Sequence, residues 1–230
     1  MNWAIIVAAG KGLRMGADLP KPYLPLSGMP VLGRTLTTFS RSEQFEELVV
    51  VVAAEEMETC RREVVEPLGL KAGLRLVAGG RERQDSVFNG LQACRGHADD
   101  PVLIHDGVRP LVRAALLTRC LAAARQKGAC TAAIPASDTL KQSRADGRIT
   151  QTLDRDNLWR AQTPQGFRLG LIRAAHRKAR QEGFTGTDDA QLVERIGQPV
   201  FIVPGQRTNI KLTHPDDLPL VEAIWQHLHR

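Results

Sequence analysis

Short, continuously apolar runs separated by longer amphipathic stretches constrain the fold of this chain more than any other feature of its sequence. The runs lack the alternation of a half-buried strand, and five of them are predicted strands: Ala4–Ala8, Leu48–Ala53, Arg75–Val77, Val102–His105 and Thr131–Pro135. The stretches between them are predicted helices: Val31–Ser40, Glu55–Glu66, Gln84–Cys94 and Ala114–Gln126. Right-handed helical crossovers between such strands give a parallel sheet covered on both faces. The sequence therefore predicts a doubly wound α/β sandwich.

Residues 139–155 break this rhythm. Asp146-Gly147 lies between two polar, extended segments, Thr139–Gln142 and Arg148–Thr152, which is typical of a β-hairpin. Because neither segment has a strongly apolar face, the pattern leaves two interpretations open: a loose loop, or an arm that a partner subunit orders. Beyond it we expect a helix at Leu169–Glu182 and another that starts near Thr187. Two strands are expected at Pro199–Val203 and Asn209–Leu212. A last helix, capped by Thr213, is expected from about Pro215 to His227.

Composition narrows the class of protein. The 230 residues fit one large domain or two small ones, and the net charge of +6 suits a basic site for phosphates. Without a basic run, and with one tyrosine, the chain is not expected to bind nucleic acid. The four cysteines share no metal-site spacing, which favours reduced, partly buried thiols. With no signal peptide and no apolar run long enough to span a bilayer, we expect no membrane association and a cytoplasmic protein.

A glycine-rich turn follows the first predicted strand. Gly10 and Gly12 suit a backbone that passes close to a ligand, although a plain strand–helix turn needs similar residues. The dinucleotide-binding pattern fails because Met15 stands where its third glycine belongs, and no Gly-Lys-Ser/Thr follows as in a P-loop. Arg14 and Lys21 share a loop with this turn, and their positive charges favour a site that holds a nucleoside triphosphate.

Asp106 and Arg109 follow directly on the strand that ends at His105. In open parallel sheets the ligand crevice lies at the carboxyl ends of the strands, so both should face the same crevice as the glycine turn. Asp106 can accept hydrogen bonds from hydroxyls or hold magnesium through water, and Arg109 can bind an anion; alternatively, the two form a salt bridge that shapes the loop. His105 is interpreted as structural. Residues 79–86 either read a base through backbone groups and Ser86 or form a capped turn.

Seven motifs, in order and over nearly the whole chain, resemble those of 2-C-methyl-D-erythritol 4-phosphate cytidylyltransferases. They are Ala8-Ala9-Gly10-x-Gly12-x-Arg14-Met15, Pro20-Lys21, Gly79-Gly80-x-x-Arg83-x-x-Ser86-Val87, His105-Asp106-x-x-Arg109-Pro110, Asp154-Arg155-x-x-Leu158-Trp159, Thr163-Pro164-Gln165 and Asn209-Ile210-Lys211. The resemblance implies transfer of CMP from CTP to methylerythritol phosphate in the non-mevalonate isoprenoid pathway. It also implies a Rossmann-like fold, with residues 1–230 as one nucleotidyltransferase domain, residues 137–156 as a protruding β-arm, and a homodimer whose arms complete each other's sites.

The resemblance also implies a role for each site residue. As catalytic residues it implies Arg14, Lys21, Arg155 and Lys211. For CTP binding it implies Ala8, Ala9, Gly10, Gly12, Arg14, Lys21, Gly80, Arg81, Ser86, Asp106 and Gly107. For the methylerythritol phosphate it implies Asp106, Arg109, Thr139, Arg155, Thr163 and Lys211, with Thr139, Arg155 and Thr163 coming from the partner subunit. Mg2+ would be held mainly by the CTP phosphates, and no residue is assigned to it.

Three other functions are weighed against this one. A ribitol-5-phosphate cytidylyltransferase shares the glycine turn and the His-Asp-x-x-Arg-Pro element, but Ala9 and the Asn209-Ile210-Lys211 motif favour the methylerythritol enzyme. A sugar-phosphate nucleotidyltransferase for another base is a second alternative. Arg81 stands where the family commonly has an acidic residue, so backbone groups would have to accept from the cytosine amino group. A non-catalytic nucleotide-binding domain is expected to lose charges such as Lys21 or Lys211, and both are present.

Overall fold

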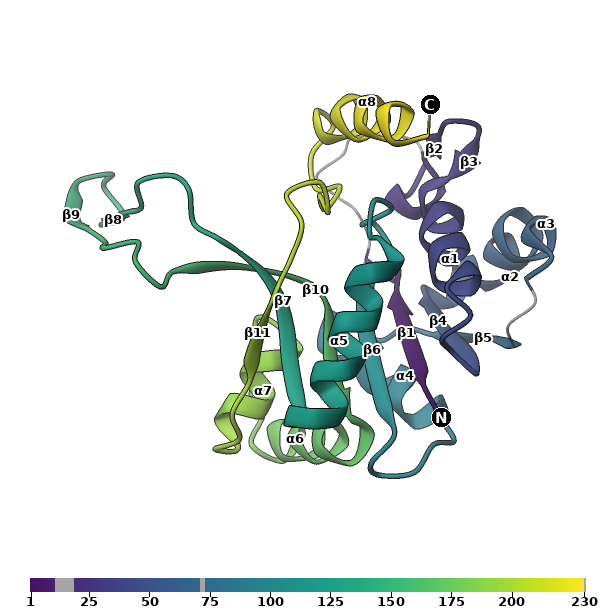
Figure 1. The fold of residues 1–230 in the computed structure, drawn as a ribbon, viewed down its shortest axis with the longest axis horizontal. Coiled ribbons are helices and arrows are strands. Elements are labelled where there is room, and N and C mark those ends of the chain that lie inside the picture. Colours follow the sequence, from purple (N-terminus) through teal and green to yellow (C-terminus); the bar gives the residue numbers. More distant parts are fainter. Residues whose placement is uncertain (11–18, 71–72, 230) are drawn as a thin grey trace.

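A seven-stranded sheet forms the centre of the molecule in the computed structural model, which describes residues 1–10, 19–70 and 73–229 (Figure 1). The strand order is β11-β7-β10-β6-β1-β4-β5, and every neighbouring pair is parallel except those that β10 makes. The strands are β1 (Trp3–Val7), β4 (Glu47–Val52), β5 (Gly73–Ala78), β6 (Pro101–Asp106), β7 (Ala129–Pro135), β10 (Trp159–Arg168) and β11 (Phe201–Pro204). The predicted α/β, mostly parallel sheet is therefore confirmed.

The direction in which successive strands are added to the sheet reverses at β1. From β1 the chain continues to β4 and β5 on one side, and β6 pairs with β1 on the other. In register, Val7 lies opposite both Val51 and Asp106, so the carboxyl ends of three strands are level. A doubly wound sheet opens a crevice for ligands at such a reversal.

Helices cover both faces of the sheet. On one face α1 (Val31–Arg41) and α5 (Ala114–Lys127) bury apolar residues against one set of strand side chains, among them Ile6 and Val50. On the other face α4 (Arg83–Ala93) and α6 (Leu169–Gln181) pack on the alternate set, among them Ile5 and Val49, with α7 (Asp189–Arg195) beside them. Two-sided burial explains why these strands are continuously apolar.

The remaining elements lie at the edges of this sandwich. They are η1 (Lys21–Tyr23), β2 (Pro25–Leu26), β3 (Met29–Pro30), η2 (Ala54–Glu56), α2 (Met57–Cys60), η3 (Arg61–Val65), α3 (Glu66–Leu68) and α8 (Asp217–Leu228). The predicted helix 55–66 is thus a succession of short helical turns. All four cysteines are buried free thiols, as expected. No helix within the described residues is long and apolar enough to span a membrane.

Strand β10 was not predicted, because its sequence is polar and contains both proline and glycine. It runs antiparallel between β6 and β7, and its register shifts between Ala161 and Gln165. The irregularity accommodates Pro164, which cannot donate to a regular ladder. The buried polar side chains have partners: Gln162 donates to the Gln206 carbonyl, and Gln165 donates to the Thr131 hydroxyl and to Asp188. Thr163, Pro164 and Gln165 therefore belong to a strand of the central sheet.

Two further expectations near the C-terminus were also wrong. Residues 209–212 form no strand, because their backbone groups bond to separate partners; Leu212 N–H, for example, donates to the Val108 carbonyl. Thr213 does not cap the last helix. Its backbone N–H instead donates to Asp217, and α8 begins at that residue.

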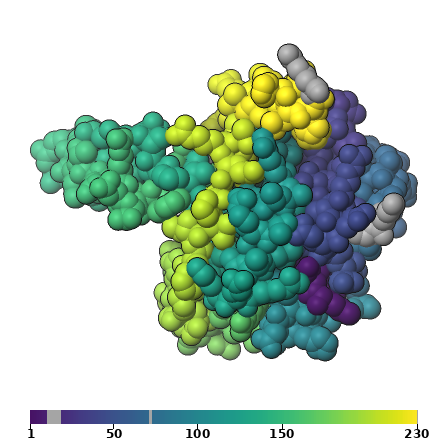
Figure 2. Space-filling model, in the orientation of Figure 1, coloured from purple at the N-terminus to yellow at the C-terminus, as the bar shows by residue number. Residues whose placement is uncertain are grey.

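The predicted hairpin exists and projects from the body of the molecule. Its strands β8 (Lys141–Ser143) and β9 (Ile149–Thr152) pair antiparallel in a sheet of their own, and Gly147 adopts the positive φ of 85° that the turn needs. Figure 2 shows the arm as a lobe standing out from the rest of the surface. Every residue from 141 to 152 is exposed, so packing within this chain does not explain the arm's position.

Candidate active site

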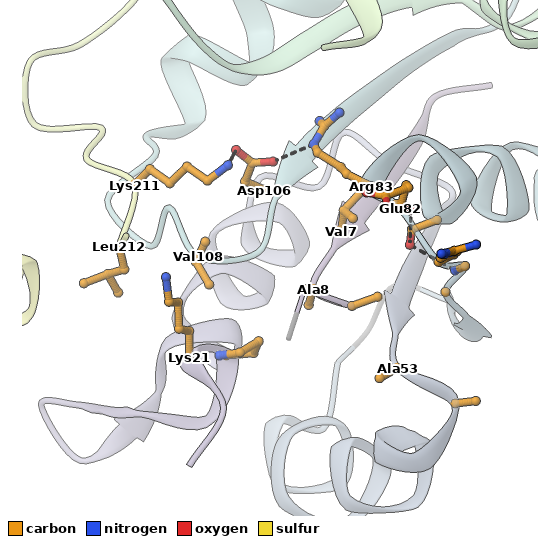
Figure 3. A pocket seen from close by; sticks show the side chains of 18 of the residues that line it. Val7, Ala8, Lys21, Ala53, Glu82, Arg83, Asp106, Val108, Lys211 and Leu212 are labelled. Carbon is orange, nitrogen blue, oxygen red and sulfur yellow. Dashed lines mark hydrogen bonds and ion pairs between the residues drawn. The ribbon is translucent and has the colours of Figure 1, made fainter. Parts of the chain in front are cut away.

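A cavity of about 750 Å³ lies at the carboxyl ends of β1, β4, β5 and β6 (Figure 3). The glycine turn after β1, the turn after β5, the end of β6 and the segment 211–213 line it. Nine of the predicted site residues meet here: Ala8, Ala9, Gly10, Lys21, Gly80, Arg81, Ser86, Asp106 and Lys211. Gly12 and Arg14 lie outside the described residues.

The turn after β5 lies unusually close to the glycine turn. A Cβ built on Gly79 would lie 2.4 Å from the Ala9 Cβ, and one built on Gly80 would lie 2.3 Å from the Asp85 Cβ. Gly80 N–H donates to the Ser86 hydroxyl, which in turn donates to the Glu82 carbonyl at the start of α4. Only glycines fit these two positions, so the backbone itself forms the wall of the cavity.

Asp106 is surrounded by positive charge at the end of β6. Its Oδ1 lies 3.2 Å from Arg83 Nε, and its Oδ2 lies 3.0 Å from Lys211 Nζ and 3.4 Å from Arg109 Nε. Figure 3 shows Lys211 and Arg83 approaching this carboxylate from opposite sides. Burial alone would raise the pKa of Asp106, but the three cations hold it well below its usual range. The carboxylate is therefore ionised at neutral pH and organises three cations beside the cavity.

Lys21 lines the cavity next to the segment 211–213. It is 9% exposed, and its Nζ donates to the Thr213 carbonyl at 2.6 Å. Because Lys211 lies two residues earlier in the same segment, residues 211–213 place both ammonium groups at one side of the cavity. This segment is fixed by the bond from Leu212 to Val108 in the loop after β6.

The residues next to Asp106 form a buried support. Gly107 N–H donates to the Val7 carbonyl, and Thr163 Oγ1 accepts from Asp106 N–H at 3.0 Å and lies 3.1 Å from His105 Nδ1. His105 is fully buried, and its Nε2 lies 3.2 Å from the Arg109 carbonyl oxygen, in agreement with a structural role. Thr163 was expected to serve the partner's site, but it bonds to Asp106 of its own chain and is 5% exposed, so that expectation was wrong.

Two predicted site residues lie away from the cavity. Thr139 and Arg155 are exposed at the base of the arm and are not among the residues that line the cavity. Arg155 donates to the Ser137 carbonyl at 2.7 Å, within the arm itself. Within one chain, the structure therefore does not bring these two residues to the other site residues.

Arg83 lines the cavity, but no role was assigned to it from the sequence. It begins α4 and bridges Asp106 and Asp189. Its place in the Gly79-Gly80 motif was visible, but its bridging role depends on Asp189, which is distant in sequence.

The described residues do not form a protein metal site. No group of three or more His, Cys, Asp or Glu side chains among them lies close enough to hold a metal ion. Asp106 directs both carboxylate oxygens at cations of the protein.

Comparison with known proteins gives a consistent result. A family model described as 2-C-methyl-D-erythritol 4-phosphate cytidylyltransferase matches residues 3–227. The protein of that name from Geobacter metallireducens is 52% identical over 224 residues and 96% of each chain, and the one from Geobacillus kaustophilus is 48% identical over 97% of each.

Solved structures agree with the sequence relatives. A 4-diphosphocytidyl-2C-methyl-D-erythritol synthase from Anaerococcus prevotii superposes with a TM-score of 0.86 at 34% identity, covering 98% of this chain and 96% of its own. A 2-C-methyl-D-erythritol 4-phosphate cytidylyltransferase from Thermus thermophilus superposes with a TM-score of 0.78, also at 34% identity, covering 96% of this chain and 98% of its own.

Proposed function

Because the chain belongs to the 2-C-methyl-D-erythritol 4-phosphate cytidylyltransferase family, we propose that the cavity beside Asp106 is where CTP meets its acceptor. The protein is a cytidylyltransferase of the non-mevalonate isoprenoid pathway. It transfers CMP from CTP to 2-C-methyl-D-erythritol 4-phosphate and releases pyrophosphate. The relatives do not favour the ribitol-5-phosphate alternative.

The backbone wall of the cavity supports the placement of the base. We place cytosine between Ala8, Ala9 and Gly10 on one side and Gly80, Arg81 and Ser86 on the other, with the ribose at Asp106 and Gly107. Gly79 packs directly against Ala9, so no side chain stands between the two turns and their residues line the cavity together. Arg81 supplies no acceptor, so backbone carbonyls are the groups that would accept from the cytosine amino group.

The clustered cations support a reaction between two anions. An oxygen of the acceptor phosphate attacks the α-phosphorus of CTP and forms a new P–O bond. The bond from that phosphorus to the β-phosphate oxygen breaks, and pyrophosphate leaves with the electron pair. The attacking oxygen already carries charge, so no general base is needed. Catalysis consists of positioning and charge neutralisation.

Each cation has a proposed part in this step. Lys21, with Arg14 outside the described residues, stabilises charge that develops on the α-phosphate. Lys211 and Arg155 orient the attacking phosphate, and Arg109 and Thr163 help to bind the acceptor. Asp106 pairs with Lys211 and Arg109 and so holds both cations near the cavity until the acceptor arrives. These partners in turn offset the cost of burying the Asp106 charge.

Magnesium is proposed to enter with the triphosphate. The described residues offer no cluster of protein ligands, so the phosphate oxygens themselves would hold the ion. Bound there, it neutralises part of the phosphate charge.

A homodimer is proposed because the arm carries Thr139 and Arg155 away from this chain's cavity. The arm makes its own small sheet and is exposed throughout, which suits an element that a second copy covers. In such a dimer, Thr139 and Arg155 of one chain would complete the cavity of the other.

We place the protein in the cytoplasm, where the four buried thiols would stay reduced.

The cation cluster around Asp106, at the end of β6 and beside the glycine walls, is the observation that carries the assignment of the cavity. A pyrophosphate-release assay tests it with the four nucleoside triphosphates and with methylerythritol and ribitol phosphates as acceptors. We expect turnover with CTP and methylerythritol phosphate, and little with the other pairs. Faster turnover with ribitol phosphate would overturn the acceptor assignment. Full activity of Asp106→Asn would overturn the assignment of the cavity.

A further inference from the structure

A chain of charged side chains leads from the cavity into the core of the molecule. Arg83 Nε lies 3.2 Å from Asp106 Oδ1, and Arg83 Nη1 lies 2.8 Å from Asp189 Oδ2. Arg83 lines the cavity, whereas the side chain of Asp189 is 1% exposed at the start of α7. One guanidinium group thus joins a carboxylate at the site to a carboxylate behind it.

Asp189 is held by two elements that do not carry Arg83. Its Oδ1 lies 3.1 Å from Nε2 of His176, a fully buried residue of α6. Its backbone N–H donates to Gln165 Oε1 in β10 at 3.1 Å. The carboxylate therefore has a fixed position relative to the sheet, and it offers Arg83 a fixed second anchor.

Both buried carboxylates depend on the positive charge of Arg83. A buried carboxylate is costly unless a cation pairs with it, and removing one partner of such a pair leaves an uncompensated charge. Burial acts to raise the pKa of Asp189, but Arg83 and His176 bring it below its ordinary value, so the carboxylate stays charged. With two carboxylates in place, the planar fork of Arg83 has one orientation that satisfies both.

We propose that Asp189 is a positioning residue for cytidylyl transfer. It acts through Arg83, with His176 behind it, to hold Asp106 with Oδ2 toward Lys211 and Arg109. This inference rests on the proposed role of the cavity and extends it to a residue that does not line the cavity. Asp106 contacts substrate in this scheme; Asp189 sets its orientation.

Asp189→Asn tests the inference, because asparagine keeps the shape and removes the charge. We expect kcat/KM for pyrophosphate release to fall about tenfold to a hundredfold, as for a misplaced catalytic group. Asp99→Asn is the matched control, because it makes the same substitution at a side chain that is 92% exposed, lies 3.9 Å from Arg168 and does not line the cavity. If the two variants had equal kcat/KM, the proposal would be wrong.

A double-mutant cycle separates positioning from general stability. Arg83→Lys keeps the positive charge but cannot bridge two carboxylates. If Asp189 acts through Arg83, then Asp189→Asn adds little further loss of kcat/KM in the Arg83→Lys background. If the two losses multiply, Asp189 acts independently of Arg83 and the proposal is overturned.

His176→Asn keeps the test open if Asp189→Asn does not fold. It leaves the Asp189–Arg83 pair in place and removes the ring behind it, so we expect a smaller loss of kcat/KM that also disappears in the Arg83→Lys background. An unchanged kcat/KM would contradict the proposal. Failure of the proposed function looks different, because Asp106→Asn would then retain full activity.

Discussion

At the scale of single residues, the site is a balance of charge around Asp106. Two buried carboxylates, Asp106 and Asp189, face three cations, Arg83, Arg109 and Lys211. The cluster therefore keeps one positive charge in excess, and Lys21, bonded to the Thr213 carbonyl, adds another positive charge to the cavity. An excess of this sign attracts an incoming phosphate, while the carboxylates prevent the cations from repelling one another out of position.

Lys211→Ala is expected to lower turnover by about a hundredfold or more, because it removes one preorganised charge from the reacting phosphate. Its side chain is 41% exposed, so the loss of its ion pair should change the melting temperature little. Steady-state pyrophosphate release and thermal unfolding measure the two effects. Arg207→Ala, an exposed cation near the same segment, is the control and should keep full activity. A folded, fully active Lys211→Ala variant would remove Lys211 from the catalytic set.

His105 predicts how stability depends on pH. Burial of its ring lowers its pKa to about 3, whereas in the unfolded chain it titrates near 6.5. Between these values the unfolded chain binds the extra proton, so this residue's contribution to stability falls as pH falls, by at most about 1.4 kcal/mol per pH unit.

Denaturant unfolding of the protein and of His105→Gln at pH 7, 6 and 5 measures this contribution. We expect the difference in free energy of unfolding between the two to shrink as the pH drops, because glutamine does not titrate. The exposed His214→Gln should give a curve parallel to that of the unmodified protein. If the His105→Gln curve were also parallel, His105 would not be the buried neutral group described here.

At the scale of elements, the strands that an apolar pattern defines were predictable from the sequence. The strand that depends on polar contacts between distant residues was not. Strands β1, β4 and β6 were predictable because burial on both faces requires continuous apolar residues. Strand β10 was not, since its buried Gln162 and Gln165 depend on partners that are distant in sequence. At residues 209–212 an apolar pattern predicted a strand that does not exist. The side chain of Leu212 is buried in an apolar cluster, but its backbone joins no sheet.

The candidate site divides in the same way. Asp106 and Lys21 were predictable because each lies next to a recognisable turn or strand end. The bridge from Arg83 to Asp189 was not, because 106 residues separate them. The place of Thr163 beside its own Asp106 likewise depended on the unpredicted strand β10.

Replacing residues 140–153 by two glycines is expected to weaken dimerisation and lower turnover at least about tenfold. The sheet should survive, because β8 and β9 pair only with each other and their residues are exposed. Light scattering after gel filtration gives the mass in solution, and thermal unfolding reports the body of the molecule. Arg148→Ala, at the tip of the intact arm, is the control. An unchanged dimer in the shortened variant would show that the arm is not the interface.

At the scale of the whole molecule, the proposed site is divided between body and arm. Asp106, Lys21 and Lys211 lie at the sheet's crevice, whereas Thr139 and Arg155 lie on the projecting arm (Figure 1). The cavity of a single chain therefore lacks two of the residues proposed for the site, Thr139 and Arg155. Two copies that exchange arms would each complete the other, and a two-fold axis makes the two exchanged contacts equivalent.

This division predicts complementation between two inactive variants. Lys211→Ala damages a cavity in its own chain, whereas Arg155→Ala damages the cavity of the partner. In a mixed dimer one cavity carries both defects, and the other has Lys211 of its own chain and Arg155 from the partner. Random exchange in an equal mixture makes half the dimers mixed, so we expect about one quarter of the unmodified activity. Mixing Lys21→Ala with Lys211→Ala is the control and should restore nothing, because both defects act within one chain's cavity. If Lys211→Ala and Arg155→Ala stayed inactive after demonstrated subunit exchange, Arg155 would serve its own chain, and the arm would not complete the partner's site.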